Sequence, residues 1–283
     1  MPVTIVTDTC HYLPQALIAE KGIREVSLYV HHEGTAEPES GITDYKAYYH
    51  KLATSATLPT TSQPSIGDFL AVYEPILAEG NEIVSIHLAG GMSGTVRAAE
   101  QAREQLGENA SRVQVLDSAT ACGGEGLMVL AAAAAAAAGG DADAVAAHAR
   151  EARERLTLWF AIETLEYLRR GGRIAGASAW LGTALKIKPI LTVEAEITPI
   201  ERVRTSKRAF EKLVTVFETG KAAGADAWVV QHIQAPEQAA ELEIRGREIF
   251  GTDPAFVSEI GPVIGTHVGP GLLGAGTVPQ SLI

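Results

Sequence analysis

Three polar segments interrupt the hydrophobic pattern of the chain and carry the side chains best suited to chemistry. Each offers hydroxyl, imidazole or backbone donors at a predicted junction between a strand and a helix. In open α/β sheets, ligands bind beyond the carboxyl ends of the strands, where helix N-termini expose free N–H groups. The pattern therefore favours an anion-binding site. The segments are Thr60-Thr61-Ser62-Gln63-Pro64-Ser65, Gly90-Gly91-Met92-Ser93-Gly94-Thr95 and Gly265-Thr266-His267-Val268-Gly269-Pro270-Gly271.

The second of these segments, a glycine-rich loop, fits two interpretations. Gly90, Gly91 and Gly94 would let the backbone approach an anion closely, and the hydroxyls of Ser93 and Thr95 would add donors. The same spacing is typical of a glycine-rich turn in which Ser93 caps the following helix. Two better-known motifs are not met, because a phosphate loop needs a lysine and a nucleophile elbow needs glycine where Thr95 stands.

Histidines supply no metal site in this sequence. His267 lies between glycines, in a segment that we expect to be too irregular for a core helix. A lone histidine is more often structural than functional, so both roles stay open. His31 and His32 would point to opposite faces of a strand. Together with Asp8 and Cys10 they give no metal-ligand spacing.

A serine hydrolase or acyltransferase is the enzyme class that these residues could form. Ser93 would be the nucleophile, His267 the base, and Asp8 or Asp117 the third member. Such a triad is defined by hydrogen-bond geometry, and the missing elbow glycine argues against it. A second alternative is a receptor for a phosphorylated small molecule at the glycine-rich loop.

Charge is unevenly distributed along the chain. The net charge of −11 argues against general binding to nucleic acid or to anionic membranes. Residues 169–208, however, carry nine bases and three acids, so this segment is +6 and the rest of the chain is −17. A solvated face would explain the segment, but its opposition to the whole-chain charge favours a docking face for an anionic partner. The bases are Arg169, Arg170, Arg173, Lys186, Lys188, Arg202, Arg204, Lys207 and Arg208.

Length and composition indicate a protein with a sizeable core. The 283 residues, 46% of them hydrophobic, suit one large or two modest domains. No apolar run reaches the roughly 18–20 residues of a membrane span, and the first residues lack the pattern of an export signal. Cys10 and Cys122 lie far apart in a sequence without an export signal, and reduced thiols are the simplest interpretation of them. We therefore expect a cytoplasmic protein with at most transient membrane contact.

The first part of the chain alternates strands and helices, which predicts a mainly parallel sheet covered on both faces. Between them, Leu58–Pro64 should be an ordered loop, and Ser65 should form a capping box with Asp68. Residues 121–155 are rich in alanine and should be a scaffold of two helices around Gly139-Gly140. The expected strands are Val3–Thr7, Ile23–His32, Glu82–Leu88 and Arg112–Leu116, and the expected early helices are Leu13–Glu20 and Ile42–Leu52.

The pattern changes near residue 155, and we place a domain boundary there. The expected architecture is α/β with two domains, 1–155 and 156–283, the second with a mixed sheet. Its expected strands are Thr157–Ile162, a hairpin of Ile187–Val193 and Ile197–Val203, Trp228–Ile233 and Phe256–Ile260. Its expected helices are Thr164–Arg170, Ser206–Ala222 and one that ends at Phe250.

Short strings that run through essentially the whole chain in a fixed order resemble one protein family. They are Val6-Thr7-Asp8-Thr9 with Leu13-Pro14, Pro59-Thr60-Thr61-Ser62-Gln63-Pro64-Ser65, Met92-Ser93-Gly94-Thr95, Leu116-Asp117-Ser118, Thr164-Leu165-Glu166-Tyr167-Leu168-Arg169-Arg170-Gly171-Gly172-Arg173-Ile174, Lys188-Pro189-Ile190-Leu191 and Ile260-Gly261-Pro262-Val263-Ile264-Gly265-Thr266-His267-Val268-Gly269-Pro270-Gly271. Their ordered succession resembles the DegV family, the fatty-acid-binding subunits of bacterial fatty acid kinase.

Three departures from the usual family pattern stand out. The chain has Thr9-Cys10-His11-Tyr12 near its start, and Ala89-Gly90-Gly91 where serines are common. We expect these two changes to alter the rim of the family's ligand pocket or its ligand preference. Ala195 replaces the usual glycine of the hairpin turn, which bears on turn geometry.

The resemblance implies a lipid-binding accessory subunit of phospholipid metabolism, without a cofactor, a metal or catalytic residues of its own. A long-chain fatty acid (palmitate-, stearate- or oleate-like) would lie buried between the two domains. Its carboxylate would face uncharged donors, because a buried carboxylate needs several of them. The resemblance and the loop chemistry place that carboxylate at Thr61, Ser62, Ser93, Gly94, Thr95 and His267.

The resemblance also implies a partner, a separate kinase subunit that uses ATP to convert the bound carboxylate to an acyl phosphate. The basic segment then has a role to test, since it could dock the kinase or steady its nucleotide phosphates. The candidates for this docking are Arg169, Arg170, Arg173, Arg202 and Arg204.

Overall fold

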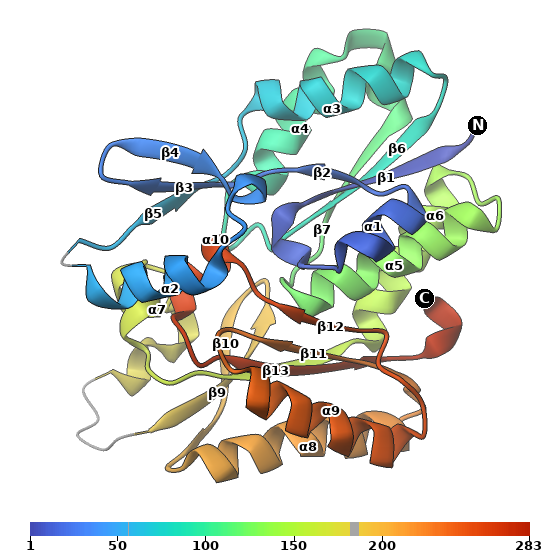
Figure 1. Cartoon of the computed structure of the whole chain (residues 1–283). Helices are drawn as coiled ribbons and strands as arrows, with labels where there is room; N and C mark the ends of the chain where they lie inside the picture. Colours follow the sequence, from blue (N-terminus) through green and yellow to red (C-terminus); the bar gives the residue numbers. More distant parts are fainter. Residues whose placement is uncertain (56, 182–186) are drawn as a thin grey trace.

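Two large β-sheets and one small one organise the chain. The structure is a computed structural model and describes residues 1–55, 57–181 and 187–283. The N-terminal sheet and the C-terminal sheet form two lobes stacked on each other, with the small sheet at one side (Figure 1). Both chain ends lie at the same side of the molecule (Figure 1).

The sheet of the N-terminal lobe is parallel throughout, as the alternation predicted. Its strand order is β2-β1-β6-β7, and each neighbouring pair runs parallel. Its four strands are β1 (Val3–Asp8), β2 (Arg24–Val26), β6 (Glu82–His87) and β7 (Val113–Asp117).

Helices cover both faces of this sheet. Phe69 and Tyr73 of α3 (Ile66–Ala78) and Ala99 of α4 (Thr95–Gln105) pack on one face. Helix α3 begins with the predicted capping box, in which Ser65 and Asp68 satisfy each other's backbone N–H groups. The other face is covered by α1 (Gln15–Lys21), α5 (Gly123–Ala137) and α6 (Ala142–Arg155).

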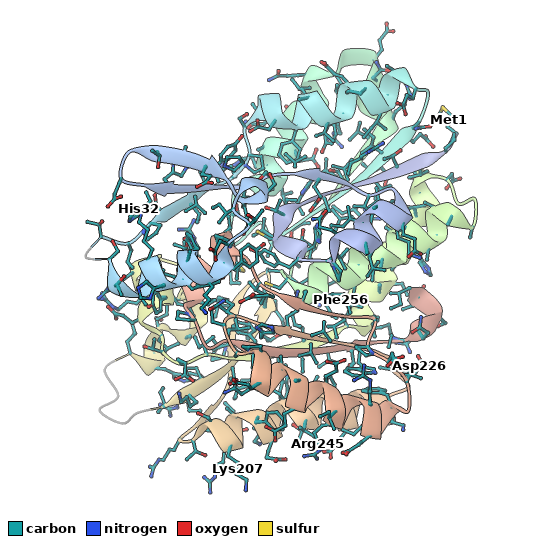
Figure 2. All side chains as sticks on the ribbon, in the orientation of Figure 1. Met1, His32, Lys207, Asp226, Arg245 and Phe256 are labelled. Carbon is teal, nitrogen blue, oxygen red and sulfur yellow. The ribbon has the colours of Figure 1, made fainter. Side chains whose placement is uncertain are left out.

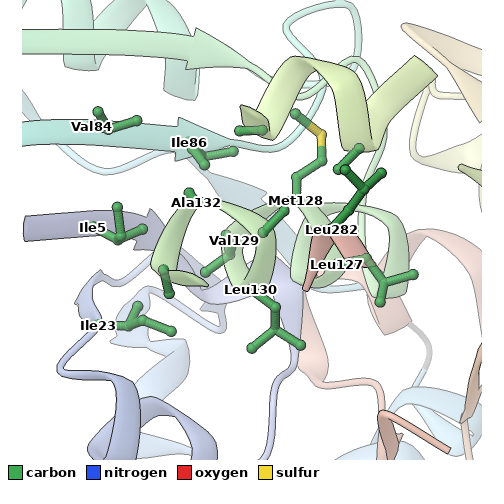
Figure 3. Close-up of a cluster of buried hydrophobic side chains, with 14 of the residues drawn as sticks. Ile5, Ile23, Val84, Ile86, Leu127, Met128, Val129, Leu130, Ala132 and Leu282 are labelled. Carbon is green, nitrogen blue, oxygen red and sulfur yellow. The ribbon is translucent and has the colours of Figure 1, made fainter. Parts of the chain in front are cut away.

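The alanine-rich helix α5 lies between the two large sheets. Its side chains share one buried cluster with Ile5 and Ile86 of the N-terminal sheet (Figure 3). Val229 of the C-terminal sheet belongs to the same cluster. Ala131 and Ala132 are fully buried. Small side chains let a helix approach a sheet on two sides at once, so the alanine run is a spacer between the lobes, as the composition indicated.

The C-terminal lobe contains the predicted mixed sheet, with strand order β10-β9-β8-β13-β11-β12. All pairings are antiparallel except that of β11 with β12. Its outer face is covered by α8 (Ser206–Ala222) and α9 (Pro236–Phe250), from which Lys207 and Arg245 project, while Phe256 lies between the lobes (Figure 2). The strands are β8 (Thr157–Ala161), β9 (Lys188–Glu194), β10 (Glu196–Val203), β11 (Ala227–His232), β12 (Phe256–Glu259) and β13 (Leu273–Val278).

The predicted hairpin of β9 and β10 is confirmed, and its turn is unusual. Ala195 has a φ of +62°, a left-handed conformation that favours glycine. The backbone N–H of Ala195 donates to the carbonyl of Ala119 at 2.8 Å, which holds the turn against the N-terminal lobe. The substitution of alanine for the usual glycine therefore leaves the turn in place, at a conformational cost.

Three local predictions were wrong. Ile23–His32 is two strands, because Val26 and Leu28 are buried in different clusters: β2 joins the parallel sheet and β3 (Tyr29–His32) the small sheet. The predicted loop Leu58–Pro64 contains β5 (Thr60–Ser62), which gains backbone pairing with β3. The small sheet is completed by β4 (Thr35–Pro38).

The third error concerns the glycine-containing segment around His267. It forms a helix, α10 (Pro262–Val268), which begins with Pro262 at its first position and ends before Gly269. Gly265 permits close packing, because a Cβ there would collide with the Tyr49 hydroxyl group of α2 (Tyr45–Thr54). In this segment glycine serves helix packing, not loop formation.

Strand β13 was missed altogether. Its Gly274, Ala275 and Gly276 give no alternating pattern of large side chains, yet it pairs with both β8 and β11 at the centre of the sheet. The division into domains 1–155 and 156–283 stays a prediction. The parallel sheet ends at Asp117 and the mixed sheet begins at Thr157.

Candidate functional site

A small cavity between the lobes contains most of the predicted carboxylate-binding residues. We call it the head pocket; its volume is about 60 Å³. Strand β5, the glycine-rich loop, the chain after α7 (Glu166–Arg170) and helix α10 all contribute to its wall. The lining residues are Leu28, Thr61, Ser62, Gln63, Leu88, Met92, Ser93, Leu168, Arg173, Val263, Ile264, His267 and Val268.

The predicted hydroxyl and imidazole groups reach the head pocket from different elements. Thr61 Oγ1 and His267 Nε2 lie 2.7 Å apart. Ser62 Oγ lies 2.7 Å from His31 Nε2 of β3. Ser93 Oγ lies 2.8 Å from the hydroxyl of Thr95. Each hydroxyl of the pocket therefore already has one partner, which fixes its position and leaves it able to make a further hydrogen bond.

Two predicted site residues, Gly94 and Thr95, stand behind the pocket wall. Thr95 is fully buried as the first residue of α4, and Gly94 precedes it as the N-cap. A Cβ at Gly94 would come within 2.7 Å of the Gln63 side chain. Similarly, a Cβ at Gly91 would lie 2.5 Å from the carbonyl oxygen of Ala195. These glycines allow close contact between parts of the protein, where the sequence suggested close contact with an anion.

His267 is held in an uncharged state. Burial and the nearby Arg173 lower its pKa to about 4. Its Nδ1 atom is buried and has no hydrogen-bond partner in the described part of the chain. A Cβ at Gly171 would collide with that atom, so only glycine fits beside the ring. Because the cationic Arg173 disfavours a second positive charge at this ring, neutral imidazole is the form that meets a ligand.

The Nε2 atom is the ring nitrogen that meets the Thr61 hydroxyl group, and the direction of this hydrogen bond depends on the tautomer of His267. In the tautomer with a proton on Nε2, the ring donates to Thr61 Oγ1, and the Thr61 hydroxyl hydrogen is free to donate to an anion in the head pocket. In that tautomer the pair forms a short relay of uncharged donors.

A second cavity continues from the head pocket and is almost entirely apolar. We call it the apolar cavity; its volume is about 40 Å³. Met92, Ile264 and Val268 line both cavities and form the wall between them. The remaining lining residues come from both lobes: Ala121, Cys122, Leu158, Phe160, Val193, Ile197, Gln231, Ile260, Leu272 and Gly274.

The arginines predicted to dock a partner divide into two groups. Arg169 and Arg170 are exposed on α7 and pair with Glu166 at 2.7 and 2.5 Å. Arg202 of β10 and Arg204, which follows that strand, are also exposed. Arg202 also lies over the ring of Trp180, 5.4 Å from its centroid. Lys186, one of the nine bases, lies outside the described residues.

Arg173 belongs to the second group, because it lines the head pocket. Its Nη1 donates to the carbonyl of Gly171 at 2.6 Å, and its Nε donates to the carbonyl of Met92 at 3.4 Å. The expectation that only uncharged groups face the ligand is therefore wrong. Arg173 follows the left-handed Gly172 (φ +70°) at the end of α7, and residue type and spacing alone did not distinguish it from Arg169 and Arg170.

The residues proposed for a hydrolase do not meet. His267 contacts Thr61, and Asp8 contacts the Nδ1 atom of His87 at 3.1 Å. Asp117 instead accepts backbone N–H groups of Gly90 and Ala119.

A different Ser–His–Asp chain does exist, but it is fully buried inside the N-terminal lobe. His87 Nε2 lies 2.7 Å from Ser85 Oγ, which also accepts a hydrogen bond from the hydroxyl of Tyr73. Asp8, Ser85 and His87 have no exposed surface, so this chain holds the core together and is closed to substrate.

Neither a metal cluster nor a membrane helix is found in the parts of the chain that the structure describes. No group of three His, Cys, Asp or Glu side chains among residues 1–55, 57–181 and 187–283 is arranged to hold a metal ion. Within the same ranges, every helix is too short or too polar to cross a bilayer.

Comparison with known proteins gives one consistent match. The profile of a family described as "Uncharacterised protein, DegV family" matches residues 2–280. A DegV domain-containing protein of Clostridium acetobutylicum is 36% identical over 278 residues, which cover 97% of this chain and 96% of that protein.

Two solved structures are similar over nearly their full length. A fatty-acid-binding DegV family protein from Thermus thermophilus is 35% identical, with a TM-score of 0.89 over 99% of this chain and 100% of its own. DegV of Bacillus subtilis, described as a fatty acid binding protein, is 30% identical, with a TM-score of 0.88 over 98% of this chain and 99% of its own.

Proposed function

Because the chain belongs to the DegV family, we propose that it binds one long-chain fatty acid, such as palmitate, stearate or oleate. The carboxylate occupies the head pocket and the tail runs into the apolar cavity. The observation that carries this proposal is the shared wall of Met92, Ile264 and Val268, which joins a polar cavity to an apolar one. Solved relatives from Thermus thermophilus and Bacillus subtilis, both described as fatty-acid-binding, support the ligand class.

The head pocket suits a carboxylate better than a phosphate ester. Thr61 and Ser62 of β5 and Ser93 of the glycine-rich loop offer hydroxyl donors, and His267 contacts Thr61. A buried carboxylate needs about this number of hydrogen bonds to replace its water. Among the described residues of the lining, Arg173 alone carries a full positive charge, whereas a phosphate dianion calls for more.

The tail supplies most of the affinity. At about 0.8 kcal/mol per buried CH₂, roughly fifteen methylenes give an upper bound near 12 kcal/mol before ordering costs. The hydrogen bonds of the head add about 1–3 kcal/mol net. Because the cavities of about 60 and 40 Å³ are smaller than such a tail, binding must displace the side chains that separate them.

The protein itself catalyses no reaction in this proposal; it presents the carboxylate to a separate kinase subunit. There a carboxylate oxygen attacks the γ-phosphorus of ATP, a new O–P bond forms, and the bond from that phosphorus to ADP breaks. The products are an acyl phosphate, still held by this chain, and ADP. Arg169, Arg170, Arg202 and Arg204 are exposed and available to dock the kinase.

Mass spectrometry of the ligand carried from expression is the first experiment. We expect one fatty acid per chain in the native protein and in Ser93→Ala, because the tail dominates binding. Ser111→Ala, at an exposed serine, is the matched control. A protein that carries a sugar phosphate or only water in place of a lipid would contradict the proposal. Complete loss of lipid from a folded Ser93→Ala would show that the tail does not contribute more affinity than the hydrogen bonds of the carboxylate.

Charge reversal tests the docking surface. Arg170→Glu with Arg202→Glu should reduce acyl phosphate formation in the presence of a kinase subunit and leave lipid binding unchanged. Arg150→Glu, at an exposed position of α6, is the control. If lipid binding falls in parallel, these arginines serve the ligand site instead. The hydrolase alternative predicts labelling of Ser93 by a fluorophosphonate and ester hydrolysis without a second protein.

A further inference from the structure

Arg173 stands apart from the other arginines of the basic segment because it lines the ligand site. Arg169 and Arg170 point outward and share the carboxylate of Glu166. Arg173 follows the left-handed Gly172 and is half-buried against the head pocket. Its guanidinium group joins the two lobes, since it donates to the carbonyls of Gly171 and Met92.

No carboxylate among the described residues neutralises this guanidinium group. Within residues 1–55, 57–181 and 187–283, the titratable or charged side chains of the pocket lining are Arg173 itself and His267 of α10. His31 of β3 stands behind Ser62, 2.7 Å from its hydroxyl oxygen. No Asp or Glu of the described chain lines the head pocket or lies within ion-pair distance of Arg173. A positive charge therefore faces a cavity whose other polar groups are uncharged.

We propose that Arg173 is the counter-ion that keeps the bound fatty acid ionised. This inference rests on the proposed function and adds the charge state of its ligand. Burial drives a carboxylic acid toward its neutral form, whereas a cation within about 4–6 Å favours the carboxylate. The carboxylate is a much stronger nucleophile toward a phosphoryl group than the neutral acid, so the counter-ion favours the form of the bound lipid that reacts.

The hydrogen bonds of Arg173 fix its guanidinium group beside the head pocket. Backbone carbonyls accept the N–H of Nε and one N–H of Nη1, so these two donors are not available to a ligand. The other N–H groups, on Nη1 and Nη2, leave the guanidinium group able to act on a carboxylate, while the hydroxyls of Thr61 and Ser93 supply further donors of the pocket.

Titration of bound [1-¹³C]palmitate by NMR tests the inference directly. In the native protein the carboxyl midpoint should lie below that of the same fatty acid bound to Arg173→Gln. The expected difference is about 1–3 pH units, the usual effect of a nearby opposite charge. Arg173→Lys keeps the charge and should stay near the native midpoint, and Arg150→Gln on the far surface of α6 should equal it.

Competition with 1-hexadecanol separates charge from structure. Hexadecanol has the same tail as palmitate but cannot ionise. Arg173→Gln should therefore lower the ratio of the affinity for palmitate to the affinity for hexadecanol. The preference should fall by about tenfold for each pH unit by which the carboxyl midpoint rises. A purely structural arginine would lower both affinities equally. That result, or equal carboxyl midpoints in the native protein and Arg173→Gln, would overturn the inference.

The native protein alone also decides the question if Arg173→Gln does not fold. A carboxyl midpoint at or above that of palmitate in detergent micelles would show that no counter-ion acts on it. By contrast, a native protein that carries no fatty acid at all would refute the proposed function, whatever Arg173 does.

Discussion

The Thr61 hydroxyl oxygen and the Nε2 atom of His267 lie 2.7 Å apart and join β5 to α10 across 206 residues of sequence. Neither element is long: β5 has three residues and α10 has seven. The hydrogen bond therefore fixes two short elements to each other at the head pocket, where both side chains face the proposed carboxylate.

Removal of the Thr61 hydroxyl should destabilise the protein. Thr61→Val keeps the shape but leaves Nε2 of His267 without a partner, in addition to Nδ1. We expect a loss of about 1–3 kcal/mol in the free energy of unfolding, measured by urea denaturation. Thr61→Ser retains the hydroxyl and is the control. Equal stability of the two variants would show that the hydrogen bond contributes nothing.

Glu39 should make stability fall as pH rises from 4.5 to about 7. Burial raises its pKa from 4.5 to about 7, although Thr9, Tyr12 and the backbone N–H of Val263 donate to it. A carboxyl group whose folded pKa is raised binds its proton more tightly in the folded state. Its contribution is therefore present below pH 4.5 and is lost as pH rises to about 7.

The matched variant for this effect is Glu39→Gln, which cannot ionise. The free energy of unfolding of the native protein should fall by about 3 kcal/mol relative to that of Glu39→Gln as the pH is raised from acid to 8. Urea denaturation of both proteins at several pH values measures the difference, in which the other titrating groups cancel. A difference that is constant with pH would contradict the prediction.

His267 should act in the opposite direction. Burial and Arg173 lower its pKa from 6.5 to about 4, so the folded state favours the neutral ring. Its contribution to stability is present above pH 6.5 and is lost as pH falls toward 4. His267→Gln should flatten this part of the pH profile, whereas His50→Gln, at an exposed position, should not. If NMR showed that the imidazole ring of His267 titrates with a midpoint near neutral pH, the lowered pKa would be disproved.

The hairpin turn offers a stabilising substitution. Ala195 has a φ of +62°, which costs an L-residue about 1–2 kcal/mol relative to glycine. Ala195→Gly should therefore raise the melting temperature. Glycine also increases the entropy of the unfolded chain, which offsets part of this gain. Ala147→Gly makes the same chemical change at an exposed position inside α6 and should lower it. If both substitutions changed the melting temperature in the same direction, relief of backbone strain at Ala195 would be excluded as the cause.

Much of the fold could be predicted because its signals are local. The buried runs of β1 and β6, the capping box at Ser65 and the alanine run of α5 each follow from neighbouring residues. Elements whose pattern depends on distant partners were missed or misassigned. Strand β13 is rich in glycine and alanine and is defined by its pairing with β8 and β11.

The candidate site shows the same division. Thr61, Ser62, Ser93 and His267 stand out in sequence because hydroxyls and an imidazole interrupt apolar segments, and all four line the head pocket. The direction of Arg173 could not be predicted. Only Gly171 and Gly172 separate it from Arg170, yet Arg173 lines the pocket and Arg170 is exposed outside it.

The sequence by itself determined the chemistry available to this protein: which side chains can donate hydrogen bonds, where charge accumulates, and which segments form strands and helices. Only the tertiary structure decided which of these groups meet and what space they enclose. The physical reason is that residue type and short-range periodicity act over a few positions of the chain. The head pocket and the apolar cavity depend instead on packing between β5, the glycine-rich loop, α10 and the mixed sheet, whose relative placement is set by the whole core.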